Sequence, residues 1–262
     1  MKVLFIGDVV GKPGRVLLRR RLPELIQRHG IEYAVANAEN SAGGAGATPE
    51  TCAEMFGAGI DCLTSGNHIW DKKEILGYFE REPRLLRPAN YPDPNPGSGV
   101  HVGHTHSGAR IAVVNLMGRV FMANLDCPFR TADAILEELE GKADCIIVDM
   151  HAEATSEKVA MGWYLDGRVA AVIGTHTHIP TADERVLPKG TAYLTDVGMT
   201  GPFDSVIGVD KNQVLERFLT QRNVRFQPAE GDARLHAALI DIDPATGGAR
   251  SIQRIALKDD TE

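Results

Sequence analysis

Five short apolar runs in this sequence each end in residues that can bind a metal ion or transfer a proton. They are VLFIG followed by Asp8, YAVANA followed by Glu39 and Asn40, DCLTSG followed by Asn67 and His68, CIIVDM followed by His151, and AAVIGT followed by His176 and His178. Such runs are typical of strands that are covered on both faces. In open α/β sheets the carboxyl ends of strands form the ligand crevice. The pattern therefore predicts an α/β fold in which these distant residues converge on one site.

The remaining elements fit the same fold class. Strands are expected at residues 3–6, 33–37, 61–64, 111–116, 145–149, 169–173, 191–195, 235–242 and 251–257, and helices at 13–29, 49–58, 71–80, 131–140, 155–165 and 210–221. The last two strands should pair antiparallel through the turn at 243–248. Residues 87–99 contain too much proline and glycine for regular structure. That segment could link two domains, but because apolar strands continue on both sides of it, we expect a long connection within a single domain over residues 1–262.

Composition and charge argue against several classes of protein. A net charge of −7 and a pI near 5.7 disfavour a partner as long and anionic as nucleic acid. We find no run of about 18 apolar residues, so no membrane span is expected. The first apolar run meets Asp8 too early for a signal peptide. Four cysteines without C-x-x-C spacing favour reduced thiols and a cytoplasmic location. The sequence does not decide the oligomeric state, and a homo-oligomer stays possible.

The sequence contains the triplet His-Thr-His twice, at 104–106 and at 176–178. The first copy follows a loop rich in proline and glycine, so we expect an exposed turn between strands. The second copy leaves a buried strand directly through Gly174. In an extended segment, residues two apart face the same way. If the segment is extended, His176 and His178 can therefore reach one site.

The residues at the five strand ends indicate which metals the site would suit. They comprise two carboxylates, two asparagines and up to four histidines, with no cysteine. Oxygen and imidazole ligands suit iron, manganese, zinc or cobalt and argue against iron–sulfur clusters or structural zinc. Seven ligands exceed what one ion with an open position needs. They suit two ions about 3.5–4 Å apart, bridged by a carboxylate, as in phosphate-ester hydrolases.

The motifs resemble those of the calcineurin-like metallophosphoesterases, and in detail those of their YmdB-type phosphodiesterase branch. The matching stretches are Gly7-Asp8-Val9-Val10-Gly11, Ala38-Glu39-Asn40, Gly66-Asn67-His68 with Trp70-Asp71, and Gly174-Thr175-His176-Thr177-His178. The resemblance covers most of the chain. It implies a four-layer αββα sandwich of two mixed β-sheets flanked by helices. It also implies a dinuclear, metal-dependent phosphodiesterase that acts through a metal-bridging hydroxide on small phosphodiesters, such as 2′,3′-cyclic nucleotides.

Two positions depart from the superfamily pattern. Val10 stands where the usual Asp-x-His motif has its histidine, and Glu39 stands where an aspartate usually bridges the ions. Asn40 is expected to fill the coordination that the missing histidine leaves. Because an amide is a harder and weaker ligand than an imidazole, this exchange bears on metal preference, and iron or manganese is expected ahead of zinc.

The resemblance also implies how the ligands divide between the two ions. One ion would be held by Asp8, Glu39, Asn40 and His178, and the other by Glu39, Asn67, His151 and His176, with Glu39 as the bridge. His68 then has no necessary metal role. It can contact the substrate's phosphoryl oxygen together with Asn67, and it can protonate the leaving group. Asp71 could orient His68 or be an acid in the first turn of a helix.

Other interpretations of single motifs are weaker. His151-Ala152-Glu153 matches half of a zinc deaminase signature, but that chemistry needs a later P-C-x-x-C pair and every cysteine precedes His151. The glycine-rich residues 41–46 lack the Gly-Lys-Ser/Thr of a P-loop. They are expected to form a loop beside the site that could act as a lid. Two alternative functions stay open, a phosphomonoesterase and a regulatory protein that senses a nucleotide with low turnover.

Overall fold

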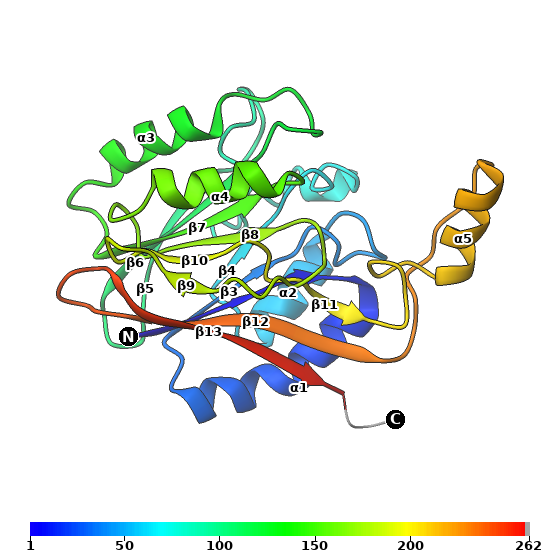
Figure 1. Cartoon of the computed structure of the whole chain (residues 1–262), viewed down its shortest axis with the longest axis horizontal. Helices are drawn as coiled ribbons and strands as arrows, with labels where there is room; N and C mark the ends of the chain where they lie inside the picture. Colours follow the sequence, from blue (N-terminus) through cyan, green and yellow to red (C-terminus); the bar gives the residue numbers. More distant parts are fainter. Residues whose placement is uncertain (260–262) are drawn as a thin grey trace.

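Two β-sheets packed face to face form the centre of the molecule, and helices cover their outer faces (Figure 1). The structure is a computed structural model and describes residues 1–259. Among these residues, no helix is both long and apolar enough to span a membrane.

The first sheet has the strand order β2-β11-β12-β1-β3-β4, with β13 paired to β12. Its strands are β1 (Lys2–Ile6), β2 (Asp8–Val9), β3 (Tyr33–Asn37), β4 (Cys62–Thr64), β11 (Met199–Pro202), β12 (Ala233–Ile242) and β13 (Ala249–Lys258). β1, β3 and β4 are parallel, whereas β12 runs antiparallel to both β1 and β13. The expected antiparallel pair at the end of the chain is therefore confirmed.

The second sheet has the order β5-β6-β7-β8-β10-β9. Its strands are β5 (Val100–His104), β6 (Arg110–Met117), β7 (Cys145–His151), β8 (Ala171–Thr175), β9 (Arg185–Val186) and β10 (Ala192–Leu194). The four inner strands are parallel, and the edge strands β5 and β9 are antiparallel to their neighbours. Both sheets are thus mixed, as the resemblance implied.

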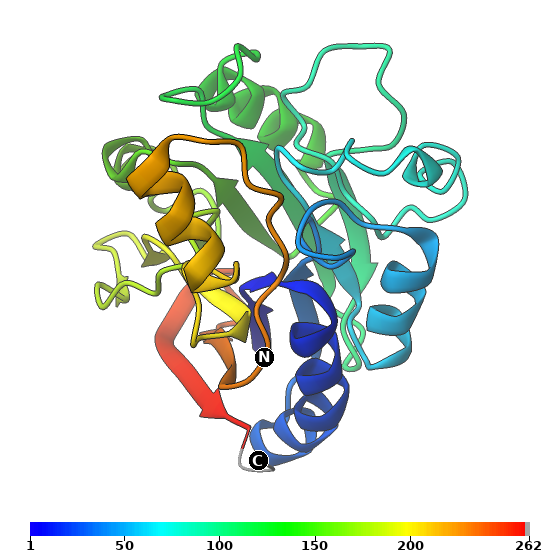
Figure 2. The same cartoon turned by 90° about the vertical axis from the view of Figure 1, so that its right-hand side faces the viewer.

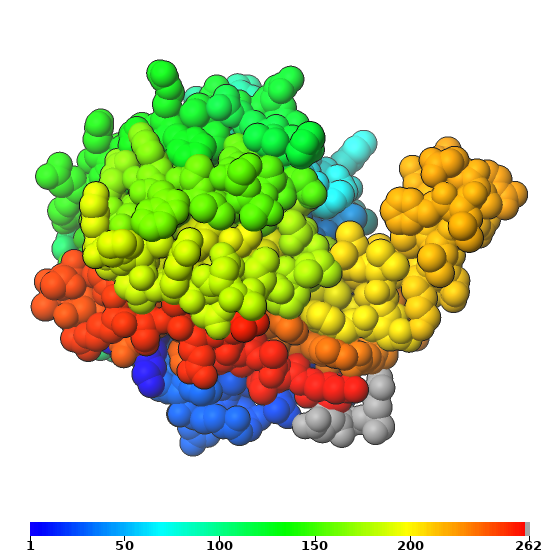
Figure 3. Space-filling model, viewed as in Figure 1, coloured from blue at the N-terminus to red at the C-terminus, as the bar shows by residue number. Residues whose placement is uncertain are grey.

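The helices are α1 (Gly11–His29), α2 (Pro49–Gly57), α3 (Pro128–Leu139), α4 (Thr155–Tyr164) and α5 (Lys211–Thr220). α1 ends at Gly30, whose φ of 63° allows the left-handed C-cap, and α2 begins at Thr48 with a capping box. α1 and α2 lie on the first sheet and α3 and α4 on the second (Figure 1). α5 stands out from the body of the molecule (Figure 3).

Three clusters of buried apolar side chains lie between these layers and join them. One joins α1 and α2 to the first sheet, and it includes Leu4 and Leu18. The second lies between the sheets and includes Phe5 and Ile147, and the third joins the second sheet to α3 and α4. Alternate residues of β1 serve different clusters, because successive side chains of a strand point to opposite faces. The four-layer αββα arrangement is therefore confirmed.

Residues 71–80 do not form the expected α-helix, so that expectation is wrong. They contain one turn of 3₁₀-helix, η1 (Lys73–Ile75), followed by turns. Trp70 packs on Phe79 and Tyr91, with ring centroids 5.6 and 5.5 Å apart. This packing and Gly77, which weakens helix formation, favour successive tight turns over a helical ladder. The strands β2, β5, β9 and β11 were also not predicted, because their sequences DV, VHVGH, RV and MTGP are not continuous apolar runs.

The segment 87–99 is irregular, as predicted, and forms the last part of the connection between β4 and β5. A second irregular segment, 221–232, was not singled out by the sequence pattern. It runs from the end of α5 back to β12 and passes the start of α1 (Figure 2). This second segment forms part of the cavity described below.

Candidate metal centre

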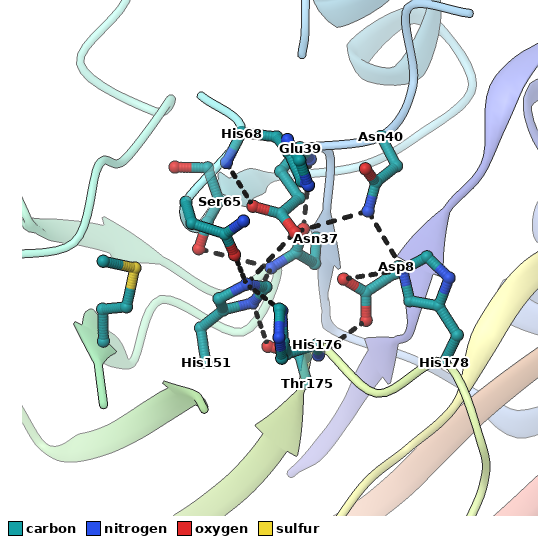
Figure 4. A network of polar contacts seen from close by, with 12 residues as sticks. Asp8, Asn37, Glu39, Asn40, Ser65, His68, His151, Thr175, His176 and His178 are labelled. Atoms are coloured by element: carbon teal, nitrogen blue, oxygen red, sulfur yellow. Dashed lines mark hydrogen bonds and ion pairs between the residues drawn. The ribbon is translucent and has the colours of Figure 1, made fainter. Parts of the chain in front are cut away.

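The structure brings the polar residues of the five strand ends together at one place (Figure 4). Asp8 opens β2, Glu39 and Asn40 follow β3, Asn67 and His68 follow β4, His151 ends β7, and His176 and His178 follow β8. The first three groups come from one sheet and the last two from the other. The site therefore lies where the carboxyl ends of both parallel sets meet, as the strand-end pattern predicted.

One half of the site is centred on His151, which is fully buried. Its Nε2 atom lies 3.1 Å from Glu39 Oε1, 3.0 Å from Asn67 Oδ1 and 3.1 Å from His176 Nδ1. Glu39, His151 and His176 each place a ligand atom within 4.8 Å of the others. Four atoms with lone pairs thus converge on one small volume, which a cation or a proton must occupy.

The other half of the site joins Asp8, Asn40 and His178. His178 Nε2 lies 3.0 Å from Asn40 Nδ2 and 3.8 Å from Asp8 Oδ1. Asn40 Nδ2 also donates to Glu39 Oε1 over 3.3 Å, so Glu39 lies between the two halves. Asn40 presents its amide nitrogen here, and a flip of the amide would present the oxygen that a metal needs.

Each of the three histidines has its second ring nitrogen engaged. His178 Nδ1 donates to the carbonyl of Ile207 over 2.8 Å, and His176 Nε2 lies 3.1 Å from Glu153 Oε2. His151 Nδ1 lies 2.9 Å from Thr175 Oγ1, which donates to Asp149 Oδ1. Since a neutral imidazole carries one N–H, these partners leave the site-facing nitrogens with their lone pairs free.

The segment that carries His176 and His178 is not extended. The two side chains therefore do not reach the site by the alternation of an extended strand. His176 has φ of 99° and His178 has φ of 66°, both in the left-handed region. The two side chains still reach the same site, through a turn. Such backbone conformations are costly for residues other than glycine and persist where the surroundings hold them.

A buried ion pair holds that turn. Asp196 Oδ2 accepts hydrogen bonds from both the backbone N–H and the hydroxyl of Thr177, at 3.1 and 2.8 Å. The same oxygen lies 2.6 Å from Lys158 Nζ, and both charged side chains are 1% exposed. The middle residue of the triplet is therefore anchored between the two histidines.

Two glycines of the motifs are required by close packing. A Cβ atom on Gly66 would lie 2.1 Å from His151 Nε2 and 2.5 Å from Glu39 Oε2. A Cβ atom on Gly174 would lie 1.7 Å from the carbonyl oxygen of Thr195. Any side chain at position 66 would thus collide with His151 and Glu39, which explains a glycine before Asn67.

The electrostatics of the site couple these groups strongly. Burial would lower the pKa of His151, but the Glu39 carboxylate beside it raises the pKa to about 9. Burial would raise the pKa of Glu39, but His151 lowers it to about 2. Burial and the neighbouring His151 lower the pKa of His176 to about 3, and burial raises the pKa of Asp8. The buried acids thus favour a positive charge placed among them, which a bound cation would supply.

The donor set fits metal ions. Asp8 Oδ1 is buried and makes no hydrogen bond, which is costly for a carboxylate oxygen unless a cation is near. The converging atoms are carboxylate oxygens, an amide oxygen and imidazole nitrogens, which iron, manganese and zinc accept. The structure thus supports metal binding by these residues.

His68 lies at the rim of this group. Its backbone N–H donates to Glu39 Oε2 over 3.1 Å, and its Nδ1 atom lies 2.9 Å from Asp71 Oδ2. Because no α-helix begins at Asp71, the helix-acid interpretation of that residue is wrong. The contact instead makes Asp71 a partner that orients the His68 ring and leaves Nε2 free.

A cavity of about 410 Å³ opens over the site. Its polar end is lined by Glu39, Asn40, His68, Glu153, His176 and His178, and its apolar end by Val10, Ile207, Val209, Phe226 and Pro228. The glycine-rich loop lines it as well, at Gly43 and Gly44. Its volume is in the range of about 300–1,000 Å³ that is usual for small-molecule sites.

The other His-Thr-His triplet, residues 104–106, makes its contacts away from this centre. His104 ends the edge strand β5, and residues 105–108 form the predicted turn, with His104 and His106 both exposed. The backbone N–H of His106 bonds to Glu32, which precedes β3. The triplet thus lies at the amino ends of the strands, opposite the site. His29 at the end of α1 and His236 on β12, stacked on Phe203, also lie outside the site.

Sequence reasoning missed the residues that orient the ligands. Asp149 is fully buried, where burial raises its pKa to about 6, and it accepts hydrogen bonds from Thr175, Asn37 and Thr64. A signal was present, because Asp149 is an acid inside the apolar run CIIVDM. Glu153 appeared only in the discarded deaminase motif, and nothing in the sequence pointed to Phe226.

Comparisons with known proteins agree with this picture. The chain matches the model of a family described as YmdB-like protein over residues 4–255. A 2′,3′-cyclic-nucleotide 2′-phosphodiesterase of Bacillus subtilis (strain 168) is 48% identical over 260 residues, which are 99% of this chain and 98% of the relative. A crystal structure of a hypothetical protein from Thermus thermophilus has a TM-score of 0.93 at 44% identity and covers 99% of this chain and 100% of that one. The crystal structure of a novel phosphatase from Mycoplasma pneumoniae has a TM-score of 0.93 at 34% identity, with coverage of 100% and 95%.

Proposed function

The chain belongs to the YmdB-like protein family, and from that premise we propose that it is a metal-dependent phosphodiesterase that hydrolyses small phosphodiesters, with 2′,3′-cyclic nucleotides as the preferred substrates. The observation that carries the proposal is the convergence of the strand-end carboxylates, amides and imidazoles beside a cavity of small-molecule size. The identity to the Bacillus subtilis phosphodiesterase over nearly the whole of both chains supports the substrate class.

We propose that the site holds two metal ions, iron or manganese ahead of zinc. Asp8, Glu39, Asn40 and His178 would hold one, and Glu39, Asn67, His151 and His176 the other. When bound, such ions supply a hydroxide nucleophile at neutral pH and polarise the phosphoryl oxygen. Two observations support this division: Glu39 lies between the two halves, and the buried Asp8 Oδ1 accepts no hydrogen bond.

The protein's own residues would orient the substrate and move a proton. His68 lines the cavity, and Asp71 engages its Nδ1 atom, so that Nε2 can donate a proton to the leaving oxygen. Asn67 and His68 together would contact the phosphoryl group. His68→Ala should lower kcat by about 10²- to 10⁴-fold, with metal content kept and a smaller loss for esters with acidic leaving groups.

The absence of cationic side chains around the cavity bears on the substrate. Among the described residues, no lysine or arginine lines it. The negative charge of a substrate must then be balanced by the ions alone. A small monoanionic diester suits this better than a polyanion such as nucleic acid.

The test compares kcat/KM for a 2′,3′-cyclic nucleotide with that for the matching monophosphates, at equal manganese loading. We expect the cyclic diester to be preferred. A clear preference for the monophosphates would contradict the proposal and assign the chain to phosphomonoesterases. Binding of the cyclic nucleotide without turnover would instead favour the nucleotide-sensing alternative.

Three further properties belong to the proposal. We propose that residues 1–262 form a single domain, because the cluster between the sheets contains side chains from both of them. Thermal unfolding should then show one cooperative transition.

The four free cysteines support a cytoplasmic location. The apolar side chains that α5 exposes, Leu215, Phe218 and Leu219, support self-association, which light scattering would measure.

A further inference from the structure

The cavity over the metal centre has a second end with different chemistry. At this end Phe226 and Pro228 lie on the irregular segment 221–232, and Ile207 and Val209 lie on the loop before α5. Phe226 is 43% exposed, although it is a large aromatic side chain. The cavity thus runs from a group of metal-binding side chains to an apolar wall that includes one accessible aromatic ring.

The wall is fixed in place although its segment has no regular structure. The backbone at Gln227 is bonded on both sides, since its carbonyl accepts from the N–H of Asp210 over 3.0 Å and its N–H donates to Gln213 Oε1 over 2.8 Å. Pro228 packs against glycine backbone at Gly44, where an added Cβ atom would lie 3.1 Å from its ring. The wall and the glycine-rich loop therefore pack directly against each other beside the cavity.

Phe226 also has a cationic neighbour. The guanidinium of Arg217 lies 5.8 Å from the centre of its ring, within the distance of a cation–π contact. Other apolar side chains of this region, such as Phe218 and Leu219 at 70% and 83% exposed, do not line this cavity. Phe226 differs from them because it faces the space that also contains the site-facing ends of His176 and His178.

The two ends of the cavity suit the two ends of one molecule. An anion belongs at the metal centre, because no lysine or arginine of the described chain lines the rest of the cavity. The apolar end suits a flat, uncharged ring, which can stack on an aromatic side chain. A nucleoside cyclic phosphate has an anionic phosphate on one side of its ribose and a base on the other.

We propose that Phe226, backed by Pro228, is the base-binding wall of the substrate site, on which the nucleobase of a cyclic nucleotide stacks while its phosphate lies at the metal centre. This inference rests on the proposed function and names the part of the substrate that the apolar end recognises. Phe226 is then a residue for substrate affinity and has no part in the chemical step.

The test uses two diesters that differ only in the base. They are adenosine 2′,3′-cyclic phosphate and 1-O-methylribose 2′,3′-cyclic phosphate, which lacks a base. For Phe226→Ala we expect KM for the nucleotide to rise by about 5- to 100-fold, the range for losing one base-stacking aromatic ring. The KM for the base-free diester and both kcat values should change by less than about twofold. Phe226→Tyr should restore the nucleotide KM, and Leu219→Ala on the same projecting region should leave all values unchanged.

Equilibrium binding of both diesters to manganese-loaded protein is measured beside turnover. If the wild type hydrolyses neither diester, the proposed function fails. The ratio of the two Kd values, compared between wild type and Phe226→Ala, still tests whether Phe226 binds the base. The inference is overturned if Phe226→Ala weakens both diesters equally, or if it weakens neither. It is supported if the loss appears only for the diester that carries the base.

Discussion

Two identical triplets, His104-Thr105-His106 and His176-Thr177-His178, have different fates in this molecule. The first ends an edge strand with both histidines exposed, and the hydroxyl of its buried Thr105 bonds only within its own turn, to Ser107 and to the N–H of Ala109. In the second, Thr177 is bonded to a buried aspartate that is paired with a buried lysine. The spacing of histidines therefore does not make a metal site. The second triplet differs because a buried strand leads directly into it and the buried Asp196 fixes its central residue.

The largest difference between the triplets should appear when their histidines are removed. His176→Ala or His178→Ala removes a proposed metal ligand, and we expect kcat/KM to fall by about 10²- to 10³-fold, since metal stabilisation of the transition state is worth several kcal/mol. Metal content, measured by mass spectrometry, should fall as well. The double variant His104→Ala/His106→Ala should change neither. A loss of metal in the double variant, with none in His176→Ala, would assign the site to the wrong triplet.

Removal of the metal should also separate the triplets. If ions at about 100 times their Kd stabilise the fold by about 2.7 kcal/mol, EDTA should lower Tm by about 5–10 °C. The same shift is expected for His104→Ala/His106→Ala. A much smaller shift is expected for His176→Ala, because its metal site is already impaired. Equal shifts in all three proteins would show that the stabilising ions bind elsewhere.

The buried ion pair is the next difference. The double variant Lys158→Met/Asp196→Asn removes both charges together and so leaves no lone buried charge. We expect metal affinity to fall by about 10- to 100-fold, the usual effect of losing a group that orients a ligand. The matched control is Arg110→Met/Asp144→Asn, an exposed pair at 2.6 Å beside the first triplet. Titration with manganese measures both, and an equal loss in the control would mean that general destabilisation is the cause.

The smallest difference concerns the central threonines. Thr177→Val and Thr105→Val each remove side-chain hydrogen bonds, and each should destabilise the fold by about 1 kcal/mol. Only Thr177→Val should also weaken metal binding, because its hydroxyl holds the turn between two ligands. Thermal unfolding and manganese titration together make the comparison. If Thr105→Val weakened metal binding as much, the anchor would have no special role.

Much of the fold could be predicted because the strands are buried on both faces. Runs such as VLFI at 3–6 are too short for buried helices and are bounded by polar residues, and those polar ends locate the crevice. The expected helix at 71–80 failed for the opposite reason. Phe79 of this segment packs on Trp70, which also packs on Tyr91. The pattern of residues 71–80 alone does not reveal such tertiary contacts.

The proposed ligands could be listed from the sequence because each comes at or soon after the end of an apolar run. The groups that aim those ligands could not be listed, since they come from distant elements. Asp149 acts on His151 through Thr175, and Glu153 acts on His176 across the cavity rim. The left-handed backbone at His176 and His178 was likewise hidden, because it depends on the anchor at Asp196.

Anomalous diffraction from crystals of the manganese-loaded protein would locate the bound ions directly. We expect two peaks about 3.5–4 Å apart that share Glu39, one beside Asp8 and His178 and the other beside His151 and His176. A single peak would contradict the bridging role of Glu39. Peaks at His104 and His106, with none at Glu39, would contradict the assignment of the site as a whole.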